Sequence, residues 1–180
     1  MFVGVVSRLD SVVSGVIVLA RTSKAAARLS EQFRTGQVAK RYWAIVEGTV
    51  EPEQATLVDC LAKDDAARRV RVVRRGGQRG ELHYRVLGGF EGQSLVEVDL
   101  VTGRKHQIRA QLASRGWPIE GDRKYGAHAR RDPGIALHAV SLRFSHPTQN
   151  SPMRFDCRPP GSWRLNRFRV EFVGPEAGGD

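Results

Sequence analysis

The chain has 180 residues, of which 41% are hydrophobic, enough for one sizeable buried core, so a single domain is the default expectation. Its 29 Lys and Arg residues exceed the 19 Asp and Glu residues, and the formal net charge of +10 is typical of a nucleic-acid-binding protein. Apolar runs shorter than the ~20 residues of a membrane helix, and a start without the basic residues of a secretory signal, argue against a membrane or secreted protein. Two cysteines, Cys60 and Cys157, form no disulfide framework and fit a reducing cytoplasm.

The hydrophobic patterning predicts strands near residues 3–8, 15–20, 41–47, 68–74, 81–87, 94–101, 137–144 and 153–158, and helices near 23–35 and 104–115. The first helix has Ala26, Leu29 and Phe33 on one stripe, so it is expected to pack on a sheet. Strands joined by so few helices predict an α+β fold with a mixed, largely antiparallel central sheet. This domain is expected to span residues 1–173, and the Gly-rich tail of residues 174–180 is expected to be disordered.

Asp10 is the first candidate functional residue. It follows a short apolar run and precedes Ser14-Gly15, so it is predicted to lie in a turn between two buried strands, where catalytic side chains are often carried. Arg8 would lie on the same side of an extended chain and would keep Asp10 ionised, which suits a nucleophile or an electrostatic anchor. The alternative from spacing alone is a surface arginine beside an ordinary turn aspartate.

The predicted helix over 104–115 carries an unusual charge. Thr102 is expected to cap it, Gly116 to close it, and Ile108 and Leu112 to form its inward stripe. Its first two turns hold four groups that are cationic when protonated: Arg104, Lys105, His106 and Arg109. Cations destabilise a helix N-terminus, so an external anion or a buried carboxylate is expected to compensate them; the alternative is an ordinary solvated basic face.

The motifs, taken in order, resemble those of the RluA-type pseudouridine synthases, which isomerise uridines in ribosomal and transfer RNA. Ser7-Arg8-Leu9-Asp10 resembles the catalytic Arg-Leu-Asp segment of that family, and Lys40 to Gly48 resembles its Lys-x-Tyr-x-Ala-x-Val-x-Gly strand. Thr102 to Arg109 is similar to its Thr-Gly-Arg-Thr-His-Gln-Ile-Arg motif, which Pro118 to Asp122 and Tyr125-Gly126 continue in register. Leu137-His138-Ala139, followed by Leu142, Phe144 and His146-Pro147, resembles the closing strand. The resemblance implies the same α+β catalytic domain, structured RNA as partner, and no cofactor.

The resemblance also implies roles for individual residues. Asp10 would be the catalytic aspartate, and Arg109 would pair with it and hold it ionised. Tyr42 would stack on the target uracil and could accept a proton, although a tyrosine in such a strand is more often simply packed. Arg8 would fill the space left by the flipped nucleotide, and Ile108 would line the pocket beside the base.

Other basic residues are candidates for RNA contacts. Arg104, Lys105 and His106 belong to the third motif. The densest basic run comprises Arg68, Arg69, Arg71, Arg74, Arg75 and Arg79, and it is interpreted as a strand and hairpin tip beside the RNA groove or, equally, as a solvated charge run. The histidines have no partners at zinc-like spacing, so no metal site is expected.

Two hypotheses of different class remain. The family has sheet strands and a Lys-Pro segment before the catalytic motif, whereas Asp10 lies almost at the start here, so the N-terminal strands are expected to be missing. The first hypothesis is an active, cytoplasmic and monomeric RNA pseudouridine synthase, favoured by the joint presence of Asp10, Tyr42 and Arg109. The second is an inactive RNA-binding relative, favoured by the missing strands. A nonspecific basic DNA-binding module would explain the charge and none of the motifs.

Overall fold

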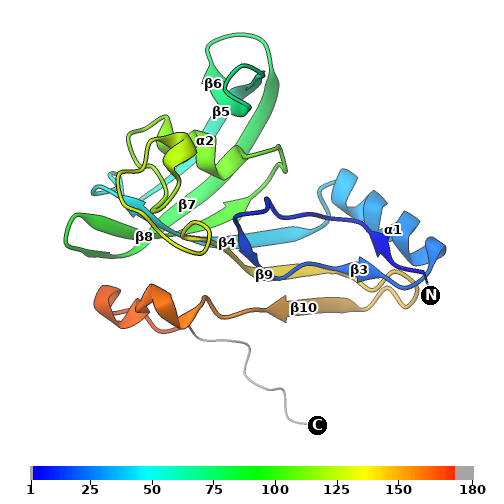
Figure 1. Ribbon diagram of the computed structural model, residues 1–180. Coiled ribbons are helices and arrows are strands. Elements are labelled where there is room, and N and C mark those ends of the chain that lie inside the picture. The colour runs from blue at the N-terminus through cyan, green and yellow to red at the C-terminus, as the bar shows by residue number, and fades with distance from the viewer. Residues whose placement is uncertain (1, 173–180) are drawn as a thin grey trace.

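A long central sheet organises the computed structural model, which describes residues 2–172 (Figure 1). Its strand order is β10-β9-β4-β8-β7-β5-β6, and β2 pairs with β9 outside this path. The strands are β1 Gly4–Val5, β2 Ser14–Gly15, β3 Leu19–Ala20, β4 Ala39–Glu47, β5 Gln54–Asp64, β6 Arg69–Val73, β7 Gln78–Phe90, β8 Gln93–Leu100, β9 Leu137–Ser145 and β10 Pro152–Asp156. The helices are α1 Ser23–Arg34 and α2 Gln107–Ala113, with short 3-10 turns at Arg123–Tyr125, Gly161–Trp163 and Leu165–Phe168.

The sheet is mixed and largely antiparallel, as predicted, because β2 and β9 form a parallel pair while the other described strand pairs are antiparallel. Together with two α-helices, this confirms the α+β fold. The main core lies where β4, β8 and β9 pack against α2 and the C-terminal turns, around Ile45, Leu95, Leu112 and Trp163.

A second, smaller core holds the N-terminal segment in place. The ribbon of β1 and β3 pairs Gly4 with Ala20 and packs with α1 over the outer part of β9. The predicted stripe of α1 faces this core, with Leu29 buried and Ala26 and Phe33 partly buried. In Figure 1 the N-terminal segment runs along β9, between α1 and the part of the molecule that carries α2.

Several predicted boundaries are wrong. Strand β5 was not predicted, because its apolar residues alternate irregularly with Asp59 and Lys63. The predicted strands 3–8 and 15–20 are two-residue ladders, and Val3 and Val5 are 52% and 63% exposed, so Asp10 does not lie between two buried strands. The predicted helix 104–115 is confined to Gln107–Ala113.

The basic run is also arranged differently from the prediction. Strands β6 and β7 do not pair with each other, since each pairs with a different edge of β5. The hairpin is therefore formed by β5 and β6, and the Gly76-Gly77 turn carries the chain past the strand β5 to begin β7. At Gly77, with φ of 82°, a side chain would collide with the backbone of Leu61, which explains a glycine there.

Across residues 2–172, none of the helices combines the length and apolar character needed to span a bilayer. Cys60 and Cys157 are both free thiols. The tail of residues 174–180, predicted to be disordered, lies outside the described residues.

Candidate active site

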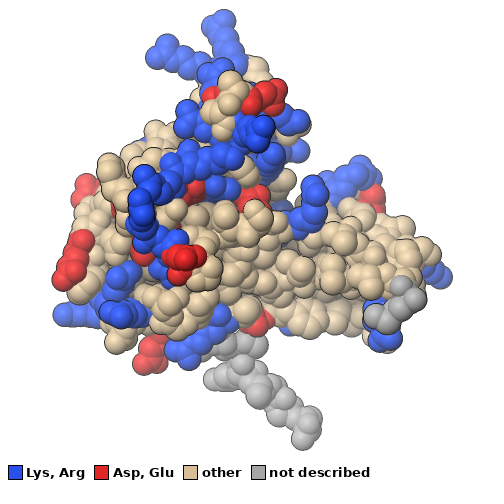
Figure 2. All heavy atoms as spheres, viewed as in Figure 1, with Lys and Arg blue, Asp and Glu red and all other residues tan. Residues whose placement is uncertain are grey.

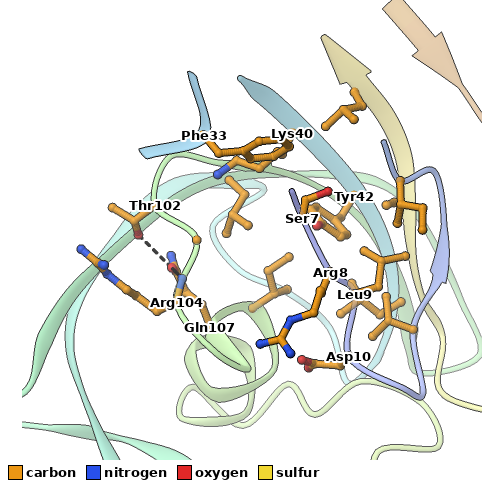
Figure 3. A pocket seen from close by; sticks show the side chains of 18 of the residues that line it. Ser7, Arg8, Leu9, Asp10, Phe33, Lys40, Tyr42, Thr102, Arg104 and Gln107 are labelled. Carbon is orange, nitrogen blue, oxygen red and sulfur yellow. Dashed lines mark hydrogen bonds between the residues drawn. The ribbon is translucent and has the colours of Figure 1, made fainter. Parts of the chain in front are cut away.

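A cleft of about 610 Å³ lies between the N-terminal segment, β4 and the chain that leads from β8 into α2. Its lining includes Arg8, Asp10, Tyr42, Ile108 and Arg109, which come from three distant parts of the sequence (Figure 3). Asp10 is the one acidic residue among the described residues that line it. The cleft thus combines a single carboxylate with several cations.

Backbone contacts hold the loop that carries Asp10. The carbonyl of Asp10 accepts a hydrogen bond from the Val13 amide at 2.9 Å, and β2 then pairs with β9 directly beneath the cleft. Gly15, with φ of 123°, approaches the backbone of Ala139 so closely that any side chain would collide with it. The loop is therefore positioned by a contact that only glycine permits.

Arg109 joins two carboxylates. Its Nη1 donates to Oδ2 of Asp10 at 3.0 Å, while Nε and Nη2 donate to the two oxygens of Asp122 at 2.6 and 2.9 Å. Arg109 is 5% exposed and Asp122 is 2% exposed, so this bidentate pair is buried. Burial lowers the pKa of Arg109, but the hydrogen bonds and charges of Asp122 and Asp10 outweigh it and leave the pKa above its ordinary value. The guanidinium is therefore a fixed cation that orients Asp10 from below.

The buried carboxylate expected to compensate the basic segment is thus Asp122, which the sequence reasoning did not name as a site residue. It ends the Pro118–Asp122 segment, whose match to the family continued in register beyond the third motif. That register was the available signal, because a lone aspartate after a glycine otherwise suggests a turn.

His106 lies next to the same pair. Its Nε2 is 3.7 Å from Oδ2 of Asp10, and its Nδ1 is 2.9 Å from the hydroxyl of Tyr125. The same hydroxyl accepts a hydrogen bond from the Val70 amide at 2.9 Å. Burial lowers the pKa of His106, against the opposing effect of Asp10, so the neutral ring is favoured at neutral pH.

Tyr42 lies on β4 opposite Val98 of β8 and Ala139 of β9, and its ring borders the cleft. Burial, with a smaller effect from Asp10, raises the pKa of its hydroxyl to about 12. At neutral pH Tyr42 is therefore an uncharged phenol, which suits a stacking surface better than it suits a base.

The prediction that Thr102 caps α2 is wrong. The N-cap residue is His106, in a left-handed conformation with φ of 52°. Instead, the hydroxyl of Thr102 donates to Oε1 of Gln107 at 2.8 Å and accepts from the Glu81 amide at 2.8 Å. Arg104 adds a bond from its amide to the same Gln107 oxygen, at 3.0 Å. These contacts make a tight loop before the helix, so Arg104 and Lys105 precede α2 and do not lie in its first turn.

The predicted RNA-binding residues fall into two groups. Arg8, Arg104, His106 and Ile108 line the cleft, whereas Lys105 is exposed outside its lining. The second group does not line the cleft: Arg68, Arg71, Arg74 and Arg75 are exposed on the β5–β6 hairpin and the turn that follows it. Figure 2 shows Lys and Arg side chains gathered over the hairpin at the top of the molecule.

The two groups are physically connected. The side chain of Arg104 donates from Nε to the carbonyl of Arg79 at 3.2 Å, which ties the cleft rim to the start of β7. Tyr125 similarly ties His106 to Val70 of β6. Among residues 2–172, no His, Cys, Asp or Glu side chains gather in a group able to bind a metal ion.

Comparisons with known proteins agree with the geometry. Residues 2–114 match the family model described as RNA pseudouridylate synthase. An uncharacterized RNA pseudouridine synthase of Bacillus subtilis, YlyB, is 35% identical over 158 residues, covering 87% of this chain and 52% of the relative. Ribosomal large subunit pseudouridine synthase D of Zymomonas mobilis is 35% identical over 174 residues, covering 90% of this chain and 54% of the relative.

Among solved structures, human RNA pseudouridylate synthase domain containing 4 superposes with a TM-score of 0.77 at 28% identity, covering 96% of this chain and 78% of that chain. Human RNA pseudouridylate synthase domain containing 1 superposes with a TM-score of 0.78 at 25% identity, covering 89% and 70%. The chain spans about half the length of the curated relatives described above.

Proposed function

Because this chain belongs to the RNA pseudouridylate synthase family, we propose that it isomerises uridine to pseudouridine in ribosomal or transfer RNA, with Asp10 as the catalytic residue. The observation that carries the proposal is the ion pair of Asp10 with the buried Arg109, at 3.0 Å, inside a basic cleft. A protein that only binds RNA gains nothing from a carboxylate directed at a polyanion. A catalyst does, because the reaction needs one group that can attack the nucleoside or remove a proton from it.

The isomerisation breaks the bond between C1′ of ribose and N1 of uracil, and the rotated base rejoins C1′ through C5. The proton on C5 is released and N1 gains a proton, so the product has the composition of the substrate and no redox partner is required. Asp10 would act as nucleophile or base at the sugar, and Arg109 would keep it ionised and aimed. The hydrogen bonds of Arg109 to both Asp10 and Asp122 support this fixed orientation.

The remaining cleft residues would hold the flipped nucleotide. Tyr42, as a neutral phenol, would stack on the uracil, and Ile108 would pack beside it. Arg8, exposed at the rim close to Asp10 in Figure 3, would occupy the space that the nucleotide leaves in the RNA stack. Flipping costs a few kcal/mol, which a planar cation on the neighbouring bases partly offsets.

The exposed arginines of the β5–β6 hairpin would contact RNA phosphates away from the cleft. Their link to the cleft rim through Arg104 and Arg79 supports one continuous RNA surface. Replacing Arg74 and Arg75 together with alanine should weaken binding to an RNA stem–loop at every sequence and lower the slope of log K against log salt by about two. Replacing Arg154, which already pairs with Asp156 on β10, should leave the slope unchanged.

The test of activity uses RNA with tritium at C5 of its uridines. Wild-type chain is incubated with such ribosomal and transfer RNA, and tritium release is compared with that of Asp10→Asn and of the control Asp99→Asn, whose carboxylate pairs with Arg41 outside the cleft. We expect release from wild type and Asp99→Asn, and none from Asp10→Asn although it still binds RNA. Mapping the product then separates ribosomal from transfer RNA.

No release from a folded, RNA-binding wild type would refute the enzymatic proposal and favour the inactive RNA-binding relative. Release that persists in Asp10→Asn would refute the role of Asp10. We propose the cytoplasm as location, which the two free cysteines support, and a monomer as the active form, which sedimentation at assay concentration tests.

A further inference from the structure

One of the cations that line the cleft, Lys40, has no ion-pair partner among residues 2–172. Lys40 lies on β4, half-buried, and lines the cleft at the end opposite Asp10 (Figure 3). Among residues 2–172 its ammonium forms no salt bridge, unlike the buried Arg109. Burial and, to a smaller extent, the positive charge of Arg104 lower the pKa of Lys40. Within the described part of the chain this positive charge is therefore half-buried and unpaired, which is unfavourable.

The position of the ammonium relative to Tyr42 indicates what it faces. Lys40 and Tyr42 are two residues apart on one strand, so their side chains project from the same face of β4. Their Cα atoms are about 7 Å apart along the strand. In Figure 3 the ammonium turns toward the segment that contains Thr102. It also lies 3.4 Å from where a side chain at Gly103 would begin, so this segment closes one side of the position without supplying a negative group.

From this arrangement we infer that Lys40 binds a backbone phosphate adjacent to the nucleotide whose base stacks on Tyr42, and that it contributes binding energy to the RNA complex. The inference rests on the proposed function, because it takes the RNA orientation from Asp10 and Tyr42. A phosphate supplies the negative charge that residues 2–172 do not supply.

A phosphate-binding lysine and a merely structural lysine differ in what its removal does. If Lys40 binds phosphate, Lys40→Met removes an unpaired charge and leaves the free protein as stable as before, or more so. At the same time it removes one RNA phosphate contact, which weakens binding on the order of tenfold. The slope of log K against log salt should become shallower by about one, because one fewer counterion is released.

The experiment measures binding of a fluorescent RNA stem–loop with uridines in its loop, from low to physiological salt. Lys40→Met is compared with wild type, with Lys40→Arg, and with Lys24→Met, an exposed lysine on α1 outside the cleft lining. We expect the loss of about one unit of slope in Lys40→Met alone. A slope in Lys40→Met equal to that of wild type and Lys24→Met would overturn the inference, whatever its stability. If Lys40→Met does not fold, Lys40→Gln is read by the same criterion.

Measuring tritium release separates an effect of Lys40 on RNA binding from an effect on the chemical step. Lys40→Met should raise KM by about the factor by which it weakens binding and leave kcat within threefold, because the lysine touches the phosphate and not the reacting base. A kcat that falls with KM unchanged would contradict this phosphate-binding role. If wild type releases no tritium, the proposed function fails, while the salt slope still reports whether Lys40 contacts RNA.

Discussion

Replacing Asp122 with asparagine isolates the effect of burial on an arginine–carboxylate pair. Asp122 accepts two hydrogen bonds from Arg109, at 2.6 and 2.9 Å, and both side chains are at most 5% exposed. Asp99 accepts two similar bonds from Arg41, at 2.8 and 2.9 Å, but these side chains are 37% and 48% exposed. Each arginine keeps a second carboxylate when the first is removed. Arg109 keeps Asp10 at 3.0 Å, and Arg41 keeps Glu97 at 3.5 Å.

The two variants should therefore differ mainly through the solvent around the pair. Breaking a buried pair typically destabilises by about 3–5 kcal/mol when the remaining charge is left without compensation, and this is an upper limit here because Asp10 still pairs with Arg109. An exposed pair contributes about 0.2–1 kcal/mol. We expect Asp122→Asn to lower the free energy of unfolding several-fold more than Asp99→Asn does, and to lower the melting temperature by about 2–4 °C for each kcal/mol.

The assay is urea unfolding followed by tryptophan fluorescence, since the core contains Trp43 and Trp163. Equal destabilisation by Asp122→Asn and Asp99→Asn would refute the reasoning that the buried pair organises the site. Asp122→Asn should also slow tritium release on the order of a hundredfold, because Arg109 would no longer hold Asp10 within the required geometry.

Three further predictions concern the supports of the site. Gly15→Ala should destabilise the fold by more than about 1–3 kcal/mol in urea unfolding, because the new side chain collides with backbone in addition to being strained at a positive φ. The control Gly36→Ala is also at positive φ but has open space around it, so it should show the cost of the strain alone. Tyr125→Phe removes the oxygen that accepts from the Val70 amide and should cost about 1–3 kcal/mol in the same assay; no loss would mean that water replaces the hydroxyl. Burial lowers the pKa of His138 below its ordinary 6.5, so the unfolded chain binds the proton more tightly than the folded chain does. The free energy of unfolding should therefore fall as the pH drops below 6.5. His138→Gln should make this fall smaller, as measured by urea unfolding between about pH 7.5 and 5.5.

Local patterns in the sequence were enough to predict much of the fold. The stripe of α1 faces the smaller core, and Ile108 and Leu112 of α2 are buried in the main core, as expected, because helical periodicity is a property of neighbouring residues. Strand β5 was missed because distant segments stabilise it. It forms hydrogen bonds with β6 on one edge and β7 on the other, and its polar residue Asp59 is paired with Arg115 and Gln111. Its polar residues therefore hid a strand that long-range partners stabilise.

For the site, the sequence by itself determined the chemical groups: Asp10, Tyr42 and Arg109, in motifs that resemble one family. The resemblance also implied that Arg109 pairs with Asp10, 99 positions away, but only the tertiary structure decided that Arg109 at the same time binds the buried Asp122. It also decided that the dense arginine run lies outside the cleft and that Lys40, which has no ion-pair partner among residues 2–172, lies inside it. The physical reason is that periodicity and charge are local properties of the chain, whereas burial and pairing depend on which distant segments meet when the sheet closes around its core.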